Sequence, residues 1–298
     1  MTLVTCVGLA VRDIIFKVPQ LPSGPGKTHA SARTEDGGGP AANAAAAIAC
    51  LSEEARLISV LGEDDIGDGI VNELNALGVD TSVIRRVSGH RSPLSSITVD
   101  DSGERAIVND AEAVLFAQAD PPTHEELDGS SAVLVDVRWP TGAEAALVWA
   151  RENNVAGVVD FDYGGKNATE LLSAASHVVF SAGALEALTG TSDPADGLIR
   201  VGESTDAWLA VTLGEHGSVW LDGDKPRHVP AFTVESVDTT GAGDVYHGVF
   251  TLELARGLDE ARAMQSASAA AALSCTKMGG RDGVPTREEL DRFLKDTQ

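Results

Sequence analysis

The segment VDTTGAGDVYHGVF, residues 237–250, decides how this chain folds and what it binds. The apolar residues Val245, Val249 and Leu252 recur on one side of a helix over 243–256, and FTVESV (232–237) predicts a strand before it. Glycine in a helix interior costs about 1 kcal/mol relative to alanine, so a glycine-rich start needs a reason. The segment predicts a strand-to-helix turn shaped for a ligand.

The first turn of this predicted helix is suited to binding an anion. Its backbone N–H groups have no partner inside the helix, and the positive end of the helix dipole lies beside them. Glycines let a phosphate approach such a turn closely. Asp244 follows the turn directly, and a carboxylate there suits a general base that takes a proton from an attacking hydroxyl. The alternative is that Asp244 is only a favourable acid at a helix start.

Two common nucleotide motifs do not fit. No G-x-x-x-x-G-K-[ST] occurs, and Tyr246 stands where G-x-G-x-x-G needs its last glycine. These absences exclude a P-loop protein and argue against a dinucleotide-dependent dehydrogenase.

A second glycine cluster, EDGGGPAANAAAAIACL, covers residues 35–51. Pro40 is favourable in the first turn of the helix predicted over 40–51, and Asn43 projects from that turn. Asp13 follows the first predicted strand. Together with the backbone of Gly38 and Gly39, these groups suit sugar hydroxyls; a tight turn before a small-residue packing helix is the alternative.

Composition sets broad limits. The chain has 298 residues, 43% of them hydrophobic, and a formal net charge of −23. Such acidity argues against a nucleic-acid partner, because binding phosphates needs clustered cations. No apolar run reaches the roughly 18 residues of a membrane helix, and no basic segment precedes the first apolar run. With three widely spaced cysteines, these features predict a cytoplasmic protein without a membrane partner.

Short apolar runs alternate with helical patterns along the whole chain, which predicts an α/β fold with a mostly parallel sheet covered by helices on both faces. The expected strands are 3–9, 56–61, 131–137, 155–160, 177–181, 207–213 and 217–221, and the expected helices include 40–51, 67–77, 142–153, 183–189, 243–256 and 259–275. Segments 12–36 and 90–111 interrupt this rhythm. We expect them to form a small β-sheet lid over the strand ends, within one domain spanning 1–298. Its exposed edges make a dimer through the lid plausible.

Several motifs in the same order resemble the PfkB (ribokinase-like) family of sugar kinases. They are Asp13, GGGPAAN, LGEDDIGDGIVNELNALGVDT, VTLGEHG and DTTGAGDVYHG, and the resemblance runs from about residue 4 to 293. It implies a three-layer α/β/α fold and transfer of the ATP γ-phosphate to a sugar hydroxyl. Asp244 would be the base, and Gly241, Ala242 and Gly243 would form the anion hole. Asp13, Gly38, Gly39 and Asn43 would hold the sugar, and Thr212, Gly214 and Gly217, with the loop 275–283, would line the nucleotide site.

The resemblance also concerns metals. Family members often hold a monovalent cation such as K⁺ near the anion hole, which implies carbonyl ligands around Asp238, Thr240 and 279–283. The family's N-x-x-E, which helps to arrange Mg²⁺, is replaced by Ser181 and Ala184. Asp160 and Asp162, at a strand end, are candidates to assist Mg²⁺ through water; ordinary turn acids are an equal alternative.

The chemical class of the sugar acceptor is predicted from the few Lys and Arg side chains near the expected pocket. Lys27, Asn109 and Arg138 lie in the expected lid or at a strand end, and together they suit an anionic end group. His90 and Arg91 are secondary candidates. With DVRW and CTKMGGRDG, the three resemble the sulfofructose kinase branch, which implies phosphorylation of 6-deoxy-6-sulfofructose at its 1-hydroxyl.

Other functions stay open from the sequence. Within the family, the alternatives are a fructose-6-phosphate or tagatose-6-phosphate kinase and a kinase of a neutral sugar. A non-catalytic sugar- or nucleotide-binding regulator on the same fold is the alternative from a different class.

Overall fold

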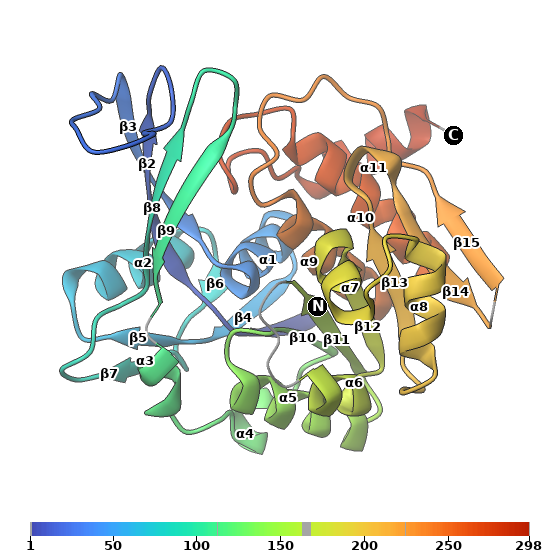
Figure 1. Ribbon diagram of the computed structural model, residues 1–298. Helices are drawn as coiled ribbons and strands as arrows, with labels where there is room; N and C mark the ends of the chain where they lie inside the picture. The colour runs from blue at the N-terminus through green and yellow to red at the C-terminus, as the bar shows by residue number, and fades with distance from the viewer. Residues whose placement is uncertain (1, 112, 163–167, 224, 298) are drawn as a thin grey trace.

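The computed structural model describes residues 2–111, 113–162, 168–223 and 225–297. Its central feature is a large twisted sheet with helices on both faces (Figure 1). Within the described residues, nine strands pair in the order β15-β14-β13-β12-β11-β10-β1-β4-β6. They are β1 Leu3–Val7, β4 Glu54–Ile58, β6 Val79–Asp80, β10 Ala132–Asp136, β11 Ala156–Phe161, β12 His177–Ser181, β13 Trp208–Thr212, β14 Ser218–Asp222 and β15 Lys225–Val229.

The sheet is parallel from β13 to β6, and β14 and β15 add an antiparallel edge. Short connections allow only antiparallel pairing, whereas each parallel pair needs a crossover, usually a helix. The strands are buried on both faces: Val158 and Val179 belong to one core and their neighbours Val159 and Val178 to the other. This explains why the strands are continuously apolar rather than alternating.

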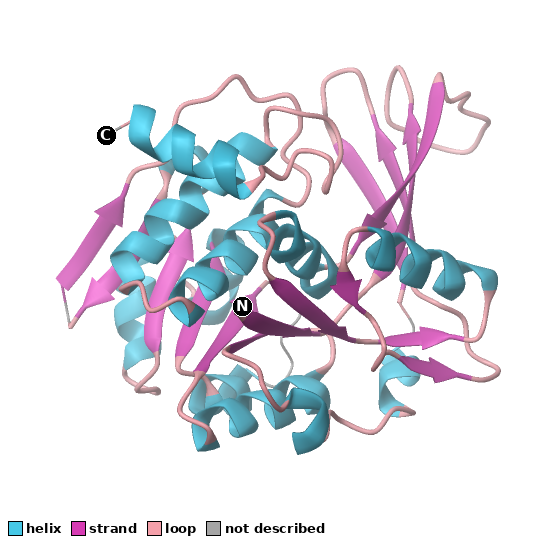
Figure 2. Cartoon of the chain, turned by 180° about the vertical axis from the view of Figure 1, so that it is seen from behind, coloured by secondary structure: helices cyan, strands magenta, loops and turns pink. Residues whose placement is uncertain are grey.

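The two layers of helices are seen from both sides in Figures 1 and 2. One core includes residues of α1 Pro40–Cys50, α2 Asp65–Ala76, α9 Ala242–Ala255, α10 Glu260–Ser274 and α11 Arg287–Asp296. The other includes residues of α3 Ala113–Ala117, α4 His124–Leu127, α5 Pro140–Glu152, α6 Ala168–Ala174, α7 Ala182–Thr189 and α8 Pro194–Gly202. The predicted three-layer fold is confirmed.

A second sheet stands apart from the body at the upper left of Figure 1. In the described part of the chain it has four strands in the order β3-β2-β8-β9, from β2 Val11–Lys17, β3 Ala32–Gly38, β8 Leu94–Val99 and β9 Arg105–Asp110. The predicted turn at 101–103 joins β8 to β9, where the Gly103 N–H donates to the Asp100 carbonyl. This sheet is the expected lid.

Two strand predictions need correction. The run 56–61 is divided, because the chain leaves the main sheet at Ser59 and β5 Val60–Gly62 pairs instead with β7 Arg85–Val87. The prediction of a strand over 232–237 is wrong. The edge strand β15 completes the sheet, and the segment after it crosses to the end of α10, where the Val237 N–H donates to the Cys275 carbonyl. Phe232 and Val234 of this segment line a cleft instead of a strand face.

Candidate active site

The turn before α9 has the geometry of an anion site. Gly241 has φ 72°, a left-handed conformation that glycine adopts without strain, and a Cβ here would lie 2.9 Å from the Gly280 carbonyl oxygen. No side chain in the described ranges caps the helix. The Ala242 N–H donates to the Thr239 carbonyl at 3.3 Å, so the turn itself occupies this one donor. The start of α9 can therefore present backbone donors and its positive dipole end to a ligand.

A cleft of about 520 Å³ opens directly onto this turn. Its size suits a small-molecule ligand. Ala242 and Gly243 of the turn line it. The three residues predicted to bind the nucleotide also line it: Thr212, Gly214 and Gly217. Further lining residues are Phe232, Val234, Tyr246, Ala271 and Ala272. The cleft therefore combines apolar walls suited to a base with an anion-binding floor.

Asp244 is held by a residue from α1. The Asn43 amide donates from Nδ2 to Asp244 Oδ2 at 2.7 Å. The two helices can approach because they meet through small residues: a Cβ on Gly248 would lie 2.8 Å from the Ala44 carbonyl oxygen. The alanine-rich sequence of α1 thus brings two glycine-rich helix starts together.

The environment of Asp244 raises the pKa of its carboxyl group, which suits a general base. Burial, aided by the neighbouring Asp160, raises the pKa of Asp244 to about 7, and the Asn43 hydrogen bond limits the rise. The residue is half-buried, beside the cleft-lining Gly243. A carboxylate with a pKa near neutrality accepts a proton better than an ordinary aspartate.

Polar side chains cross the lid in a row. Asp13 pairs in register with Asp36 on β3 and Ser95 on β8, and Ser95 pairs with Asn109 on β9. Ser95 hydrogen-bonds Asp13, and Asn109 Nδ2 donates to Ser95 Oγ at 3.1 Å. A Cβ on Gly38 would lie 2.3 Å from Asp13 Oδ2, so this row lies against the glycine cluster before α1. Burial raises the pKa of Asp13.

Arg138 follows β10, next to β1 in the main sheet. Its N–H donates to Asp136 Oδ1, and the other oxygen of Asp136 accepts from the N–H groups of Leu9 and Ala41. Asp136 thus links the end of β10, where Arg138 lies, to the start of α1 by hydrogen bonds. The Arg138 guanidinium contacts Asp162 at 3.2 Å, but its buried Nε has no partner among the described residues. One donor of this arginine is unused.

An ion pair joins the lid to the body. Arg105 of β9 contacts Asp238 Oδ1 at 3.1 Å, and Asp238 also accepts from Thr240 and from the Gly279 N–H. The lid is thereby linked to the turn that precedes α9.

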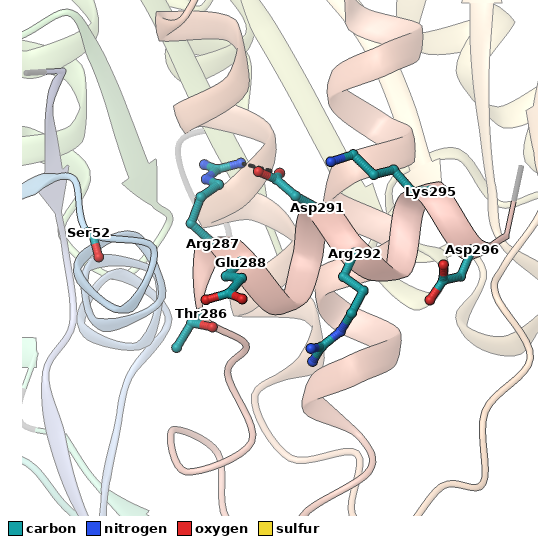
Figure 3. A pocket seen from close by; sticks show the side chains of 8 residues that line it. All are labelled: Ser52, Thr286, Arg287, Glu288, Asp291, Arg292, Lys295 and Asp296. Carbon is teal, nitrogen blue, oxygen red and sulfur yellow. Dashed lines mark ion pairs between the residues drawn. The ribbon is translucent and has the colours of Figure 1, made fainter.

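A larger hollow, about 740 Å³, lies elsewhere along α11 (Figure 3). Its charged side chains are of both signs, and Figure 3 shows Arg287 paired with Asp291. None of the sequence motifs contributes to it. Volume alone therefore does not identify the active site, and we assign it to the cleft at α9.

Comparisons with known proteins agree with this geometry. The family model described as pfkB family carbohydrate kinase matches residues 1–287. A ribokinase of Haemophilus influenzae is 30% identical over 98% of both chains, and an ATP-dependent ribose-1-phosphate kinase of Halopiger xanaduensis is 32% identical over 95% of both. A crystal structure from Agrobacterium tumefaciens, provisionally described as a ribokinase, superposes with TM-score 0.94 at 37% identity, covering 99% of this chain and 98% of the other.

The chain belongs to the PfkB family of carbohydrate kinases. It is therefore a phosphotransferase whose acceptor is a sugar hydroxyl. No helix within the described residues is long and apolar enough to cross a membrane.

Several predicted site residues of this PfkB kinase lie together. Asp244 and Asn43 are in contact, Gly38 lies against Asp13, and the predicted nucleotide residues share one cleft with Ala242 and Gly243. Gly39, with φ 96°, precedes α1, and a Cβ added at this position would overlap the Leu9 carbonyl. Asn43 differs from expectation in one respect: Asp244 and Arg281 engage its amide on both sides.

Within the part of the chain that the structure describes, no hydrogen bond or ion pair joins the three residues of the predicted anion-binding trio. Asn109 belongs to the lid row, Arg138 contacts Asp162, and Lys27 is exposed in the loop between β2 and β3. Arg91, a secondary candidate, pairs with Asp110 at 3.2 Å.

The carboxylates fit Mg²⁺ poorly as direct ligands. Burial raises the pKa of Asp160 well above its usual range, aided by Asp136 and Asp162, and this favours the neutral acid. Asp162 accepts from Arg138 and from Ser181, which caps α7 through the Ala184 N–H. Among the described residues, no group of three or more His, Cys, Asp or Glu side chains is placed to hold a metal.

Other residues of the site were not foreseen from the sequence. The wall formed by Phe232 and Val234 was mistaken for a strand, and Arg281, Glu73 and Arg105 were not singled out for a role. Arg281 stands inside the glycine-rich run MGGRDG, and a cation inside a predicted ligand loop is the one signal that could have drawn attention to it.

Proposed function

We propose that this PfkB kinase transfers the γ-phosphate of ATP to the 1-hydroxyl of a ketohexose with an anionic end, with 6-deoxy-6-sulfofructose as the best candidate. The observation that carries the phosphoryl-transfer step is Asp244, in the first turn of a helix whose start opens onto the cleft. In this proposal Asp244 accepts the hydroxyl proton, and the backbone around Gly241 and Gly243 stabilises charge on the transferred group. Asp13 and the Gly38–Gly39 backbone orient the sugar.

The acceptor class is supported by Arg138. Arg138 follows β10, and its buried Nε has no hydrogen-bond partner among the described residues, so it is suited to bind an anionic group. Asn109 adds an amide from the lid, and Lys27 adds a cation from its exposed loop. Among the relatives, the Halopiger protein is named for a phosphorylated sugar. A sulfonate carries one charge rather than nearly two, and one arginine with a neutral amide suits this smaller charge.

Mg²⁺ and a monovalent cation belong to this proposal. Because Asp160 is buried with a raised pKa and Asp162 already accepts from Arg138 and Ser181, we expect Mg²⁺ to be held chiefly by ATP and water, with any carboxylate assistance coming from the partly exposed Asp162. The turn at Thr240 lies against Gly280, and carbonyl groups from two such loops suit K⁺.

A homodimer through the lid is also part of the proposal. Ile107 and Val108 on the edge strand β9 are 58% and 72% exposed. An exposed apolar edge strand favours pairing with a second copy, and this pairing could bring Lys27 into a neighbouring site.

A substrate panel tests the acceptor. The rate of ADP release is measured with 6-deoxy-6-sulfofructose, fructose 6-phosphate and fructose at equal enzyme and ATP. We expect kcat/KM for the sulfonate to exceed that for fructose by roughly tenfold or more, the value of one charge-assisted hydrogen bond. Arg138→Ala should remove this preference, whereas Arg151→Ala on α5 should not. Equal rates with all three sugars would contradict the anionic acceptor, and no turnover with any sugar would favour the regulator.

A further inference from the structure

A buried arginine lies behind the proposed catalytic base and has no role in the mechanism above. Arg281, in the loop between α10 and α11, is 6% exposed. Its Nε donates to Asn43 Oδ1 at 2.9 Å, one terminal nitrogen contacts Glu73 Oε1 at 2.5 Å, and the other donates to the Gly38 carbonyl at 3.3 Å. It does not line the nucleotide cleft.

These contacts fix the orientation of the Asn43 amide. A guanidinium has only donors, so the Asn43 atom that faces Arg281 must be the oxygen. The NH₂ group then faces Asp244 and donates to its carboxylate. With the amide turned by 180°, its oxygen would face the carboxylate of Asp244 and its NH₂ group would face the guanidinium, so both contacts would be repulsive.

Glu73 holds the arginine in place. A buried guanidinium is stable only with a charged or well-bonded partner. Glu73 supplies it and uses its second oxygen to bind Arg12 of β2 at 2.7 Å. A Cβ on Gly37 would overlap the Arg281 guanidinium, so the glycine cluster leaves the space that the arginine fills.

We propose that Arg281 is a positioning residue that orients Asn43 so that its amide N–H holds the Asp244 carboxylate in place for the attacking hydroxyl. This inference rests on the proposed function, because it takes Asp244 as the base. Arg281 does not line the cleft and contacts Asn43, so its effect is expected in kcat rather than in the KM for ATP.

A double-mutant cycle tests the proposal. Arg281→Met, Asn43→Ala and the double variant are assayed as the full chain with Mg-ATP and the most active sugar of the panel. We expect each single variant to lower kcat by roughly tenfold with KM for ATP within about twofold, and the double variant to be no worse than the worse single variant. Arg281→Lys, which keeps a donor, should recover part of the lost kcat.

Controls separate positioning from folding. Arg56→Met removes a partly buried arginine paired with Asp80 away from the site, and kcat should stay unchanged. If Arg281→Met does not fold, the cycle is run with Glu73→Gln, which removes the negative charge that holds the guanidinium and should lower kcat in the same direction. Losses that multiply in the double variant, or a loss confined to KM, would overturn the role of Arg281. Failure of the base assignment is distinguishable, because Asp244→Asn would then remain active.

Discussion

The two parts of the site are built in different ways. At the body, α1 and α9 pack through alanine and glycine, and their starts are fixed by contacts among Asn43, Asp244 and Arg281. The lid is a single layer whose edge strand β9 is exposed along its whole length, and one ion pair to Asp238 links that strand to the body. From this difference we expect the closely packed body to set the chemistry and the lid to adjust acceptor binding.

The largest expected loss of activity follows a substitution in the body, at Asp244. Asp244→Asn keeps the shape of the side chain but removes its ability to accept a proton. We expect kcat to fall by about 100-fold or more while ATP affinity, measured by calorimetry, stays within a few fold. A variant with nearly normal kcat would show that the base lies elsewhere.

The two glycines at the start of α9 offer a matched pair. Gly241→Ala places a methyl group at φ 72° and against the Gly280 carbonyl, so we expect a loss of stability of about 1–3 kcal/mol with a loss of activity. A Cβ on Gly243 would meet no atom within 4 Å. Gly243→Ala should therefore lower kcat by crowding the phosphoryl group while the thermal midpoint is unchanged or higher. Equal loss of stability in both variants would contradict this distinction.

The pKa of Asp244 predicts how activity depends on pH. Because burial raises this pKa to about 7, kcat/KM should rise with pH through about 7 and then level off. The effect on stability has the opposite sign. The neutral acid is favoured in the fold, so this contribution is complete below the unfolded pKa of about 3.9 and is lost as pH rises through about 7. A kcat/KM limb near pH 4 would show that Asp244 is an ordinary carboxylate.

The smallest expected change in kinetics follows a substitution in the lid, at Arg105. Arg105→Ala removes the ion pair with Asp238, which is partly exposed. Such pairs contribute about 0.2–1 kcal/mol, so we expect the sugar KM to rise by at most about fivefold, less at high salt, with kcat unchanged. Arg33→Ala is the control, because Arg33 pairs with Glu35 within the lid itself. A large loss of kcat in Arg105→Ala would mean that the lid also shapes the catalytic turn.

Much of this fold follows from local sequence patterns. Most of the parallel strands and the helices over 40–51, 67–77 and 243–256 were predicted within a few residues, because apolar runs and periodic apolar faces depend on near neighbours. The short parallel strand β6 was not predicted. The strand prediction over 232–237 was wrong because apolar residues at alternate positions, such as Phe232 and Val234, can also line a cleft. The helix over 287–296 was missed although Thr286 caps it through the Glu289 N–H.

By itself, the sequence determined the chemistry at 238–244: a glycine turn that exposes backbone donors, followed at once by a carboxylate. The backbone donors and the carboxylate lie next to one another in the sequence, so their order along the chain is enough to predict that they lie together. Only the tertiary structure decided that Arg281, 238 residues beyond Asn43 in the chain, orients the amide that holds Asp244. A hydrogen bond between such distant residues depends on how α1 and the loop after α10 pack, and no local pattern records that packing.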